Sequence, residues 1–255
     1  MNIVALGTSG TYPRYGRACS GFLFADDPNF VLIDLGPGVL ANLFRYIDPS
    51  ELSAIILTHL HADHVLDIYP LRYYLQYSTS TSRKIPVYAP VGAIDVLHGF
   101  NPGNDDSEFL KKVFEFYELD NTKTRCGSGW LTIGSMRFYF VRTRHLVPTY
   151  GVLCETFEGK KIGYTSDTSY SQELVNFFKG CDVLIAEAAY QGERGKENLH
   201  MTAAEAGMFA RECGAKKLYL THIWPELDPK ASKAEAEATY GSEVSVLKEH
   251  MVIEI

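Results

Sequence analysis

The chain has 255 residues, 46% of them hydrophobic, so it can bury one sizeable core. It contains no Pro/Ser-rich linker, low-complexity tract or internal repeat, which predicts a single domain over 1–255. The formal net charge of −7 argues against an overall nucleic-acid-binding surface. With no signal-peptide pattern and no stretch near the roughly 18 apolar residues of a membrane span, we expect a cytoplasmic protein without a membrane partner.

Five cysteines are widely spaced along the chain, and no CxxC pair occurs. An odd number at such spacings argues against a disulfide framework and against a cysteine-based zinc site. We expect most of them to be small buried hydrophobic residues. They are Cys19, Cys126, Cys154, Cys181 and Cys213.

In the first 100 residues, short apolar runs alternate with segments of helical period. The apolar runs predict strands over 2–7, 20–25, 29–36, 54–58 and 85–90. Apolar residues at helical spacing predict helices over 39–47, 65–77 and 91–100, the second with a proline near its first turns.

The pattern is less clear over 101–134, where we expect a helix at 108–113 and a strand at 114–119. Antiparallel strands follow over 135–145, 150–157 and 160–167, with EGKK as a hairpin turn. The rest predicts helices over 171–180, 202–214 and 229–241, strands over 182–190 and 216–223, and a strand pair in 242–255. Strands and helices recur in both halves, which predicts an α/β architecture of two packed sheets with helices outside.

Titratable groups crowd into the segment THLHADH, directly after the apolar strand predicted at 54–58. His59 and His61 point to the same side of an extended segment, whereas Asp63 and His64 follow after the chain turns into a helix. One short loop can therefore serve two metal ions, and imidazole and carboxylate suit zinc, manganese or iron. The alternative of an ordinary polar loop is weak, because four such groups packed without a metal would leave buried polar atoms unsatisfied.

Two metal sites need more ligands than this loop supplies. Three candidates each follow a later apolar run, where a strand ends: His145, Asp167 and His222. A carboxylate such as Asp167 can bridge two metals with one oxygen to each. Taken singly, a histidine at a strand end is more often an ordinary surface or core residue. We expect His98 and His250, which match no motif, to be structural.

The cluster and these three later residues, in this order, resemble the metallo-β-lactamase superfamily, and the resemblance runs from LGTSG through LIDLG to LTHIWP. It implies a four-layer αββα sandwich of two mixed sheets, with a dinuclear metal site at one edge. It further implies two divalent ions, most simply zinc, with manganese or iron as alternatives. Carried over by position, the ligands are His59, His61 and His145 for one ion, Asp63, His64 and His222 for the other, and Asp167 as the bridge.

Glu187 at the end of a strand and His200 just before a helix are similar to the tRNase Z-like, phosphodiesterase branch of that superfamily, in its short bacterial form. The resemblance implies that His200 donates a proton to the leaving oxygen while Glu187 orients and charges the imidazole. Thr202 is the expected N-cap of the helix. The alternative for His200 is a local hydrogen bond at a helix start. No long Gly/Pro-rich arm for tRNA occurs, so an RNA substrate is open but not favoured.

The expected activity is hydrolysis of a small phosphodiester, a cyclic nucleotide or an RNA 3′ end by a hydroxide shared between two metals, with Asp63 as a further proton acceptor. An ester or lactone hydrolase is the main alternative. A di-iron redox protein and a non-catalytic binding protein are weaker ones. Tyr190, Arg142, Arg144 and the backbone N–H groups of the GTSGTYP loop are open candidates for substrate contacts, and a homodimer is left open.

Overall fold

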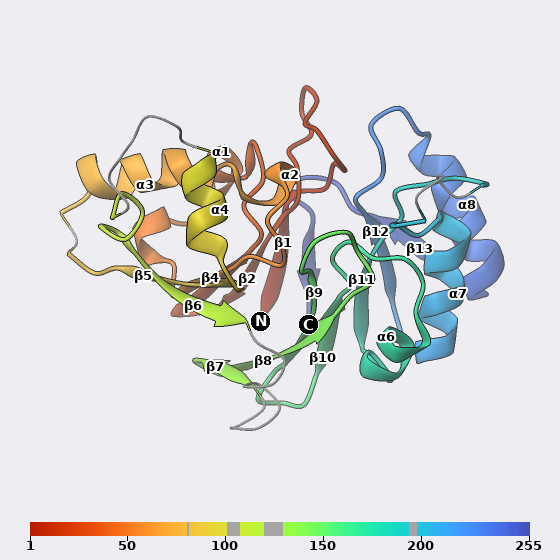
Figure 1. The fold of residues 1–255 in the computed structure, drawn as a ribbon. Coiled ribbons are helices and arrows are strands. Elements are labelled where there is room, and N and C mark those ends of the chain that lie inside the picture. Colours follow the sequence, from red (N-terminus) through yellow and green to blue (C-terminus); the bar gives the residue numbers. More distant parts are fainter. Residues whose placement is uncertain (81, 101–107, 120–129, 194–197) are drawn as a thin grey trace.

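Two mixed sheets of seven strands form the centre of the computed structural model, which describes residues 1–80, 82–100, 108–119, 130–193 and 198–255 (Figure 1). The strands of the first sheet are antiparallel as far as β3 and parallel from there to β6. Their order is β14 (Val252–Glu254), β1 (Asn2–Gly7), β2 (Gly21–Asp26), β3 (Asn29–Ile33), β4 (Ala54–Ile56), β5 (Ile85–Pro90) and β6 (Phe114–Leu119).

The second sheet repeats this scheme. Its strands are parallel from β13 to β10 and antiparallel from β10 to β7. Their order is β13 (Val244–Val246), β12 (Leu218–Thr221), β11 (Val183–Glu187), β10 (Lys161–Tyr164), β9 (Tyr150–Glu155), β8 (Met136–Arg142) and β7 (Leu131–Ile133).

Helices cover the outer face of each sheet (Figure 1). On the first sheet lie α1 (Val39–Leu43), α2 (Ala62–Val65), α3 (Ile68–Tyr77) and α4 (Ala93–Gly99), with a 3-10 turn at Pro49–Glu51. On the second lie α6 (Gln172–Phe177), α7 (Ala203–Cys213) and α8 (Pro229–Tyr240). The predicted four-layer αββα sandwich is therefore confirmed.

Strand alternation divides the core into three layers. Ile3 and Phe22 belong to the cluster between the sheets, whereas their neighbours Val4 and Leu23 pack under the helices of the first sheet. A third cluster lies between the second sheet and its helices. The central cluster includes both Ile3 and Ile253, so the two ends of the chain share one core. A single domain over 1–255 stays a prediction.

Three local predictions differ from the structure. The segment 108–113 forms turns with isolated i→i+4 hydrogen bonds, and β6 begins at Phe114 before a regular helix is completed. The helix predicted over 65–77 begins later, as α3 at Ile68, because Val65 still belongs to the end of α2. Pro70 lies in the first turn of α3, where it costs no hydrogen bond. The two strands in 242–255 do not pair with each other, since β13 joins β12 and β14 joins β1.

The described cysteines agree with their predicted role, since Cys19, Cys154, Cys181 and Cys213 are free and buried. Cys126 lies outside the described residues. Within the described ranges, none of the helices has the length and apolar character needed to cross a bilayer.

Candidate metal centre

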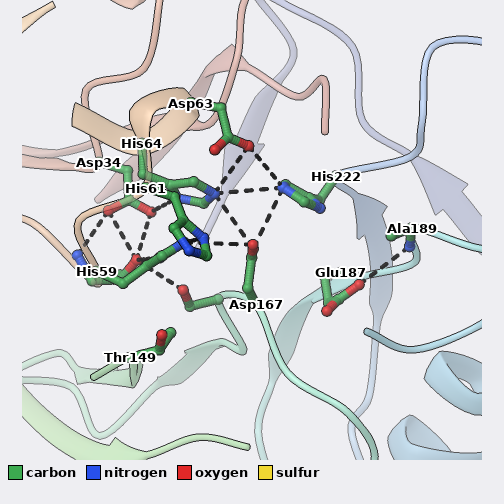
Figure 2. Close-up of polar contacts among 12 residues, drawn as sticks. Asp34, His59, His61, Asp63, His64, Thr149, Asp167, Glu187, Ala189 and His222 are labelled. Atoms are coloured by element: carbon green, nitrogen blue, oxygen red, sulfur yellow. Dashed lines mark hydrogen bonds and ion pairs between the residues drawn. The ribbon is translucent and has the colours of Figure 1, made fainter. Parts of the chain in front are cut away.

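Side chains from both sheets converge at one edge of the sandwich (Figure 2). His59 and His61 follow β4 in the first sheet, and Asp63 and His64 lie on the short helix α2. The second sheet contributes residues that follow β8, β10 and β12, namely His145, Asp167 and His222. The structure therefore brings together all the ligands that the sequence predicts.

The first group of ligand atoms surrounds His61. Its Nδ1 lies 3.1 Å from Nε2 of His59 and 3.1 Å from Nε2 of His145. Oδ2 of Asp167 is 3.5 Å from Nε2 of His59 and 3.8 Å from Nε2 of His145. Such spacing is what ligands of one ion show, because donors about 2.1 Å from a tetrahedral zinc lie about 3.4 Å apart.

The second group surrounds Nε2 of His222. This atom lies 3.4 Å from Nε2 of His64 and 3.3 Å from Oδ2 of Asp63. The other oxygen of Asp167, Oδ1, is 3.4 Å from Nε2 of His64 and 3.5 Å from Nε2 of His222. Each oxygen of this one carboxylate therefore faces a different group of ligands, as a bridge between two ions requires.

The outer ring nitrogens of three of the histidines are held by other groups, whereas Nδ1 of His222 is buried without a hydrogen bond. Nδ1 of His64 lies 2.8 Å from Asp34, Nδ1 of His59 lies 3.2 Å from the Thr58 hydroxyl, and Nδ1 of His145 lies 3.3 Å from the Leu199 carbonyl. Such contacts fix the ring and leave the inner nitrogen free to bind a metal. Oδ1 of Asp167 is buried without a hydrogen bond, which is costly unless a cation balances it. The donor set therefore fits two divalent ions.

Asp34 is a functional residue that the sequence analysis missed. Its buried carboxylate contacts Nδ1 of His64 and accepts hydrogen bonds from the Thr58 backbone N–H at 2.8 Å and from the Tyr164 hydroxyl at 3.2 Å. Figure 2 shows Asp34 beside the ligand loop, and through the Tyr164 hydroxyl it also contacts the central core. The signal that could have revealed it is an aspartate at the end of the fully apolar run in LIDLG.

Left-handed backbone conformations occur where strands of the site end. Asp34, Ser166 and His222 have φ angles of 60°, 52° and 56° and follow β3, β10 and β12. Non-glycine residues in this region each cost about 1–3 kcal/mol and persist where the surroundings hold them. Two of the three carry site chemistry themselves and the third precedes Asp167. Three of the six non-glycine residues with positive φ in the described part of the chain therefore stand where side chains are aimed into the cluster.

Burial and mutual charge set the protonation of the cluster. Burial lowers the pKa of His145 to about 4 and the pKa of His59 well below its ordinary value, which keeps both imidazoles neutral. Burial opposes ionisation of Asp63 and Asp167, but the neighbouring histidines outweigh it and lower both carboxyl pKa values. Against burial, the carboxylates raise the pKa of His64 well above its ordinary value. The ionised carboxylates of Asp63 and Asp167 therefore favour positive charge at the centre of the cluster.

Glu187 and His200 form a pair beside the cluster. Oε1 of Glu187 lies 2.9 Å from Nδ1 of His200, and the buried carboxylate also accepts hydrogen bonds from the backbone N–H groups of Thr168 and Ala189. Burial would lower the pKa of His200, but the Glu187 carboxylate outweighs it and raises that pKa to about 9. Nδ1 of His200 is 4.0 Å from Oδ2 of Asp167. Thr202 caps α7 through a capping box with Glu205.

A cavity of about 800 Å³ opens over the cluster. Asp63, Asp167 and His200 line it, and so does Tyr190. Arg142 and Arg144 are exposed and do not belong to the described lining, so the structure does not bring these two predicted candidates to the site.

The backbone N–H groups of the GTSGTYP loop, an open candidate for substrate contacts, are engaged within the protein. The N–H of Thr11 donates to Oδ2 of Asp63 at 2.9 Å, and that of Gly10 donates to the Ile223 carbonyl. The loop therefore positions Asp63 instead of holding a substrate oxygen. His250 contacts the Tyr46 hydroxyl at 3.1 Å, and His98 lies on α4, so neither is part of the cluster.

This fold and this cluster define a metal-binding αββα protein, and comparison with known proteins gives its family. The family model for the beta-lactamase superfamily domain matches residues 29–223, so the chain belongs to this family. It is 29% identical to the probable metallo-hydrolase YhfI of Bacillus subtilis over the full length of both chains. It is 27% identical to the ribonuclease Z of Myxococcus xanthus, covering 100% of this chain and 98% of that one.

Solved structures agree with the family. The crystal structure of YhfI has a TM-score of 0.85 at 28% identity, with 99% of this chain and 98% of that chain covered. Human tRNase Z in its short form has a TM-score of 0.76 at 23% identity, with 100% and 99% covered, and this is a likeness of fold. Together with the His/Asp cluster, the matches support a metal-dependent hydrolase.

Proposed function

We propose that the protein is a dinuclear metal-dependent hydrolase that cleaves a phosphodiester. The observation that carries this proposal is Asp167, whose two carboxylate oxygens face two separate groups of ligand atoms. Two bound divalent ions would supply an activated water and would stabilise negative charge on the phosphate oxygens. We propose zinc, with manganese or iron as alternatives. The ribonuclease Z relative, named for cleavage of a phosphodiester polymer, supports the substrate class.

The ligand assignment follows the two groups. We propose that His59, His61 and His145 hold one ion, that Asp63, His64 and His222 hold the other, and that Asp167 bridges them. The ligands come from both sheets, so ion binding would tie the two halves of the sandwich together. Asp63 lines the cavity, where an attacking water would release its proton, and we propose that it accepts that proton.

His200 is proposed as the proton donor to the leaving oxygen. Its Nδ1 is held by Glu187 and its ring lines the cavity, so Nε2 is the atom that would give up the proton. The Glu187 carboxylate orients the ring and stabilises its charged form. A buried carboxylate that accepts hydrogen bonds from two backbone N–H groups is itself well fixed for this task.

An ester or lactone hydrolase is the second candidate. An acyl substrate uses the same activated water, but an alkoxide held by a metal needs less help from an acid. The Glu187–His200 pair therefore favours the phosphodiester, whose alkoxide leaves less readily.

Hydrolysis assays test the proposal. The zinc- or manganese-loaded protein should cleave bis-p-nitrophenyl phosphate faster than p-nitrophenyl esters or lactones, relative to the rates of these compounds in buffer. Chelation, or the substitution Asp167→Ala, should abolish this activity. Cleavage of esters or lactones alone, or diester cleavage that survives both treatments, would contradict the proposal.

A further inference from the structure

Two aromatic rings lie in the cavity beyond His200. The ring centroid of Tyr190 is 5.7 Å from that of His200. The ring centroid of Trp224 is in turn 5.4 Å from that of Tyr190. Both residues line the cavity, and Trp224 is 37% exposed. The rings of His200, Tyr190 and Trp224 thus form a continuous row from the cluster to the rim of the cavity.

The backbone of Tyr190 is held firmly in place. Its N–H donates to the Met201 carbonyl at 3.2 Å, and its carbonyl accepts from the N–H of Ala203 at 2.9 Å. The next residue, Gln191, donates to the Ser232 hydroxyl on α8 at 2.7 Å. This wall of the cavity is therefore fixed by contacts with α7 and α8.

Trp224 also follows a fixed segment. The buried Ile223 before it accepts hydrogen bonds at its carbonyl from the N–H of Gly10 and from the Arg17 guanidinium. The Trp224 carbonyl accepts from the N–H of Leu227 at 3.0 Å. Because the backbone that carries these two rings is already fixed, ligand binding costs little further conformational entropy there, which favours affinity.

The outer part of the cavity is mainly apolar. Leu146, Leu199 and Leu227 line it together with the two rings. Within the described lining there is no lysine or arginine, and Glu193 adds a negative charge. This composition suits a flat group of low charge better than a second phosphate.

We propose that Tyr190 and Trp224 form a subsite that stacks a planar group of nucleobase size, carried by the leaving alcohol of the phosphodiester. The assignment rests on the proposed function, since His200 stands between the cluster and the rings. A proton donor faces the leaving oxygen, so the group beyond it belongs to the leaving side. A nucleoside, with its base one sugar away from the phosphate, has the required form.

Fluorescence gives a test that does not depend on turnover. The chain has two tryptophans, so Trp130→Phe leaves Trp224 as the sole reporter. In the zinc-loaded protein, adenosine 5′-monophosphate should quench this fluorescence and bind more tightly than ribose 5-phosphate. A stacked base contributes about five- to 150-fold in affinity, so Trp224→Leu should remove most of that difference, as measured by calorimetry.

Conservative variants separate stacking from a structural effect. Trp224→Phe and Tyr190→Phe keep a ring at each position and should retain most of the preference for the nucleotide. Equal affinities of the wild-type protein for the nucleotide and the sugar phosphate, with no quenching, would overturn the subsite. Equal loss in Trp224→Phe and Trp224→Leu would overturn the stacking role.

The products of a mixed diester test the leaving side. Hydrolysis of adenosine 5′-methyl phosphate should release adenosine and methyl phosphate, whereas release of methanol and adenosine 5′-monophosphate would overturn the orientation. If no diester is cleaved but the nucleotide still quenches Trp224, the stacking subsite stands, and both the proposed function and the leaving-side orientation are wrong. If diesters are cleaved without any preference for the base, the subsite is wrong and the function stands.

Discussion

Asp34 shows how one buried side chain can decide the behaviour of a metal cluster that it does not enter. Its carboxylate contacts Nδ1 of His64 and accepts a hydrogen bond from the backbone N–H of Thr58. Thr58 directly precedes the loop that carries the predicted ligands. Because the inner nitrogen of His64 faces Asp63, Asp167 and His222, any rotation of this ring would disturb the whole second group. Asp34 is therefore a positioning residue.

We predict that Asp34→Asn weakens metal binding about 10- to 100-fold, because loss of an outer partner lowers the basicity and fixed orientation of its histidine. Competition with a chromogenic chelator measures the affinity. Asp95→Asn, at an exposed position on α4, is the matched control and should bind metal as the wild type does. An unchanged affinity in Asp34→Asn would refute the positioning role.

His200 gives a second prediction at this scale. His200→Ala should lower kcat about 10²- to 10⁴-fold for diesters with alkyl leaving groups and much less for p-nitrophenyl diesters, which need little protonation. Steady-state rates over a series of leaving groups measure the effect. Glu187→Gln should show the same trend with smaller losses. A uniform loss across the series would mean that His200 donates no proton.

The sequence alone predicts some residues of the site and not others. Asp63 and His64 were found because they stand in a dense cluster, and His222 because it follows an apolar strand in a known order. Asp34 has no such pattern around it, since a single aspartate after a strand is common. Its role depends on contacts with Thr58 and Tyr164, which are distant in the sequence.

Among the elements of the fold, α2 is placed by the close approach of the loop that follows β3. The backbone of Gly36, after β3, lies so near to α2 that an added Cβ would be 1.9 Å from the Asp63 carbonyl oxygen. Only glycine fits this contact without a backbone shift, and such a shift would move Asp63 and His64.

We predict that Gly36→Ala lowers the free energy of unfolding by about 1–3 kcal/mol and weakens metal binding, because overpacking here must displace α2. Gly99→Ala is the control, since a Cβ at Gly99 meets no atom within 4 Å. Denaturant unfolding and metal titration of both variants measure the difference. Similar behaviour of the two alanine variants would contradict this account of α2.

Element prediction succeeded where the pattern is local. The strand expected at 114–119 is β6, and the helix expected after Thr202 is α7 with its capping box. The pairing of 242–255 was wrong because strand partners are chosen by distant residues, here those of β1 and β12. The residues of 242–255 alone therefore do not predict which strands they pair with.

At the scale of the molecule, the cluster joins the two sheets. His59 and His64 come from the first sheet and His145 and His222 from the second, while Tyr164 connects the central core to Asp34. In the cluster, Oδ1 of Asp167 and Nδ1 of His222 are buried without hydrogen bonds, and the two carboxylates repel each other unless cations lie between them. Metal binding should therefore stabilise the fold as a whole. A cytoplasmic location and a homodimer stay predictions.

We predict that removal of metal by a chelator lowers the Tm by several degrees, since a ligand at 100 times its Kd contributes about 2.7 kcal/mol to stability. Added zinc should restore the Tm of the wild type. In Asp167→Ala, zinc should raise the Tm much less, because the bridge is lost. Calorimetry of the apo and loaded forms measures both, and equal zinc stabilisation of the two proteins would contradict a shared bridge.

The central claim is that one carboxylate joins two metal sites in a single chain. Elemental analysis of the zinc-loaded protein, freed of excess metal by gel filtration, tests it most directly. The wild type should contain close to two ions per chain and Asp167→Ala should contain one or fewer. A wild-type protein that retains no ion, or two ions retained in full by Asp167→Ala, would contradict the account.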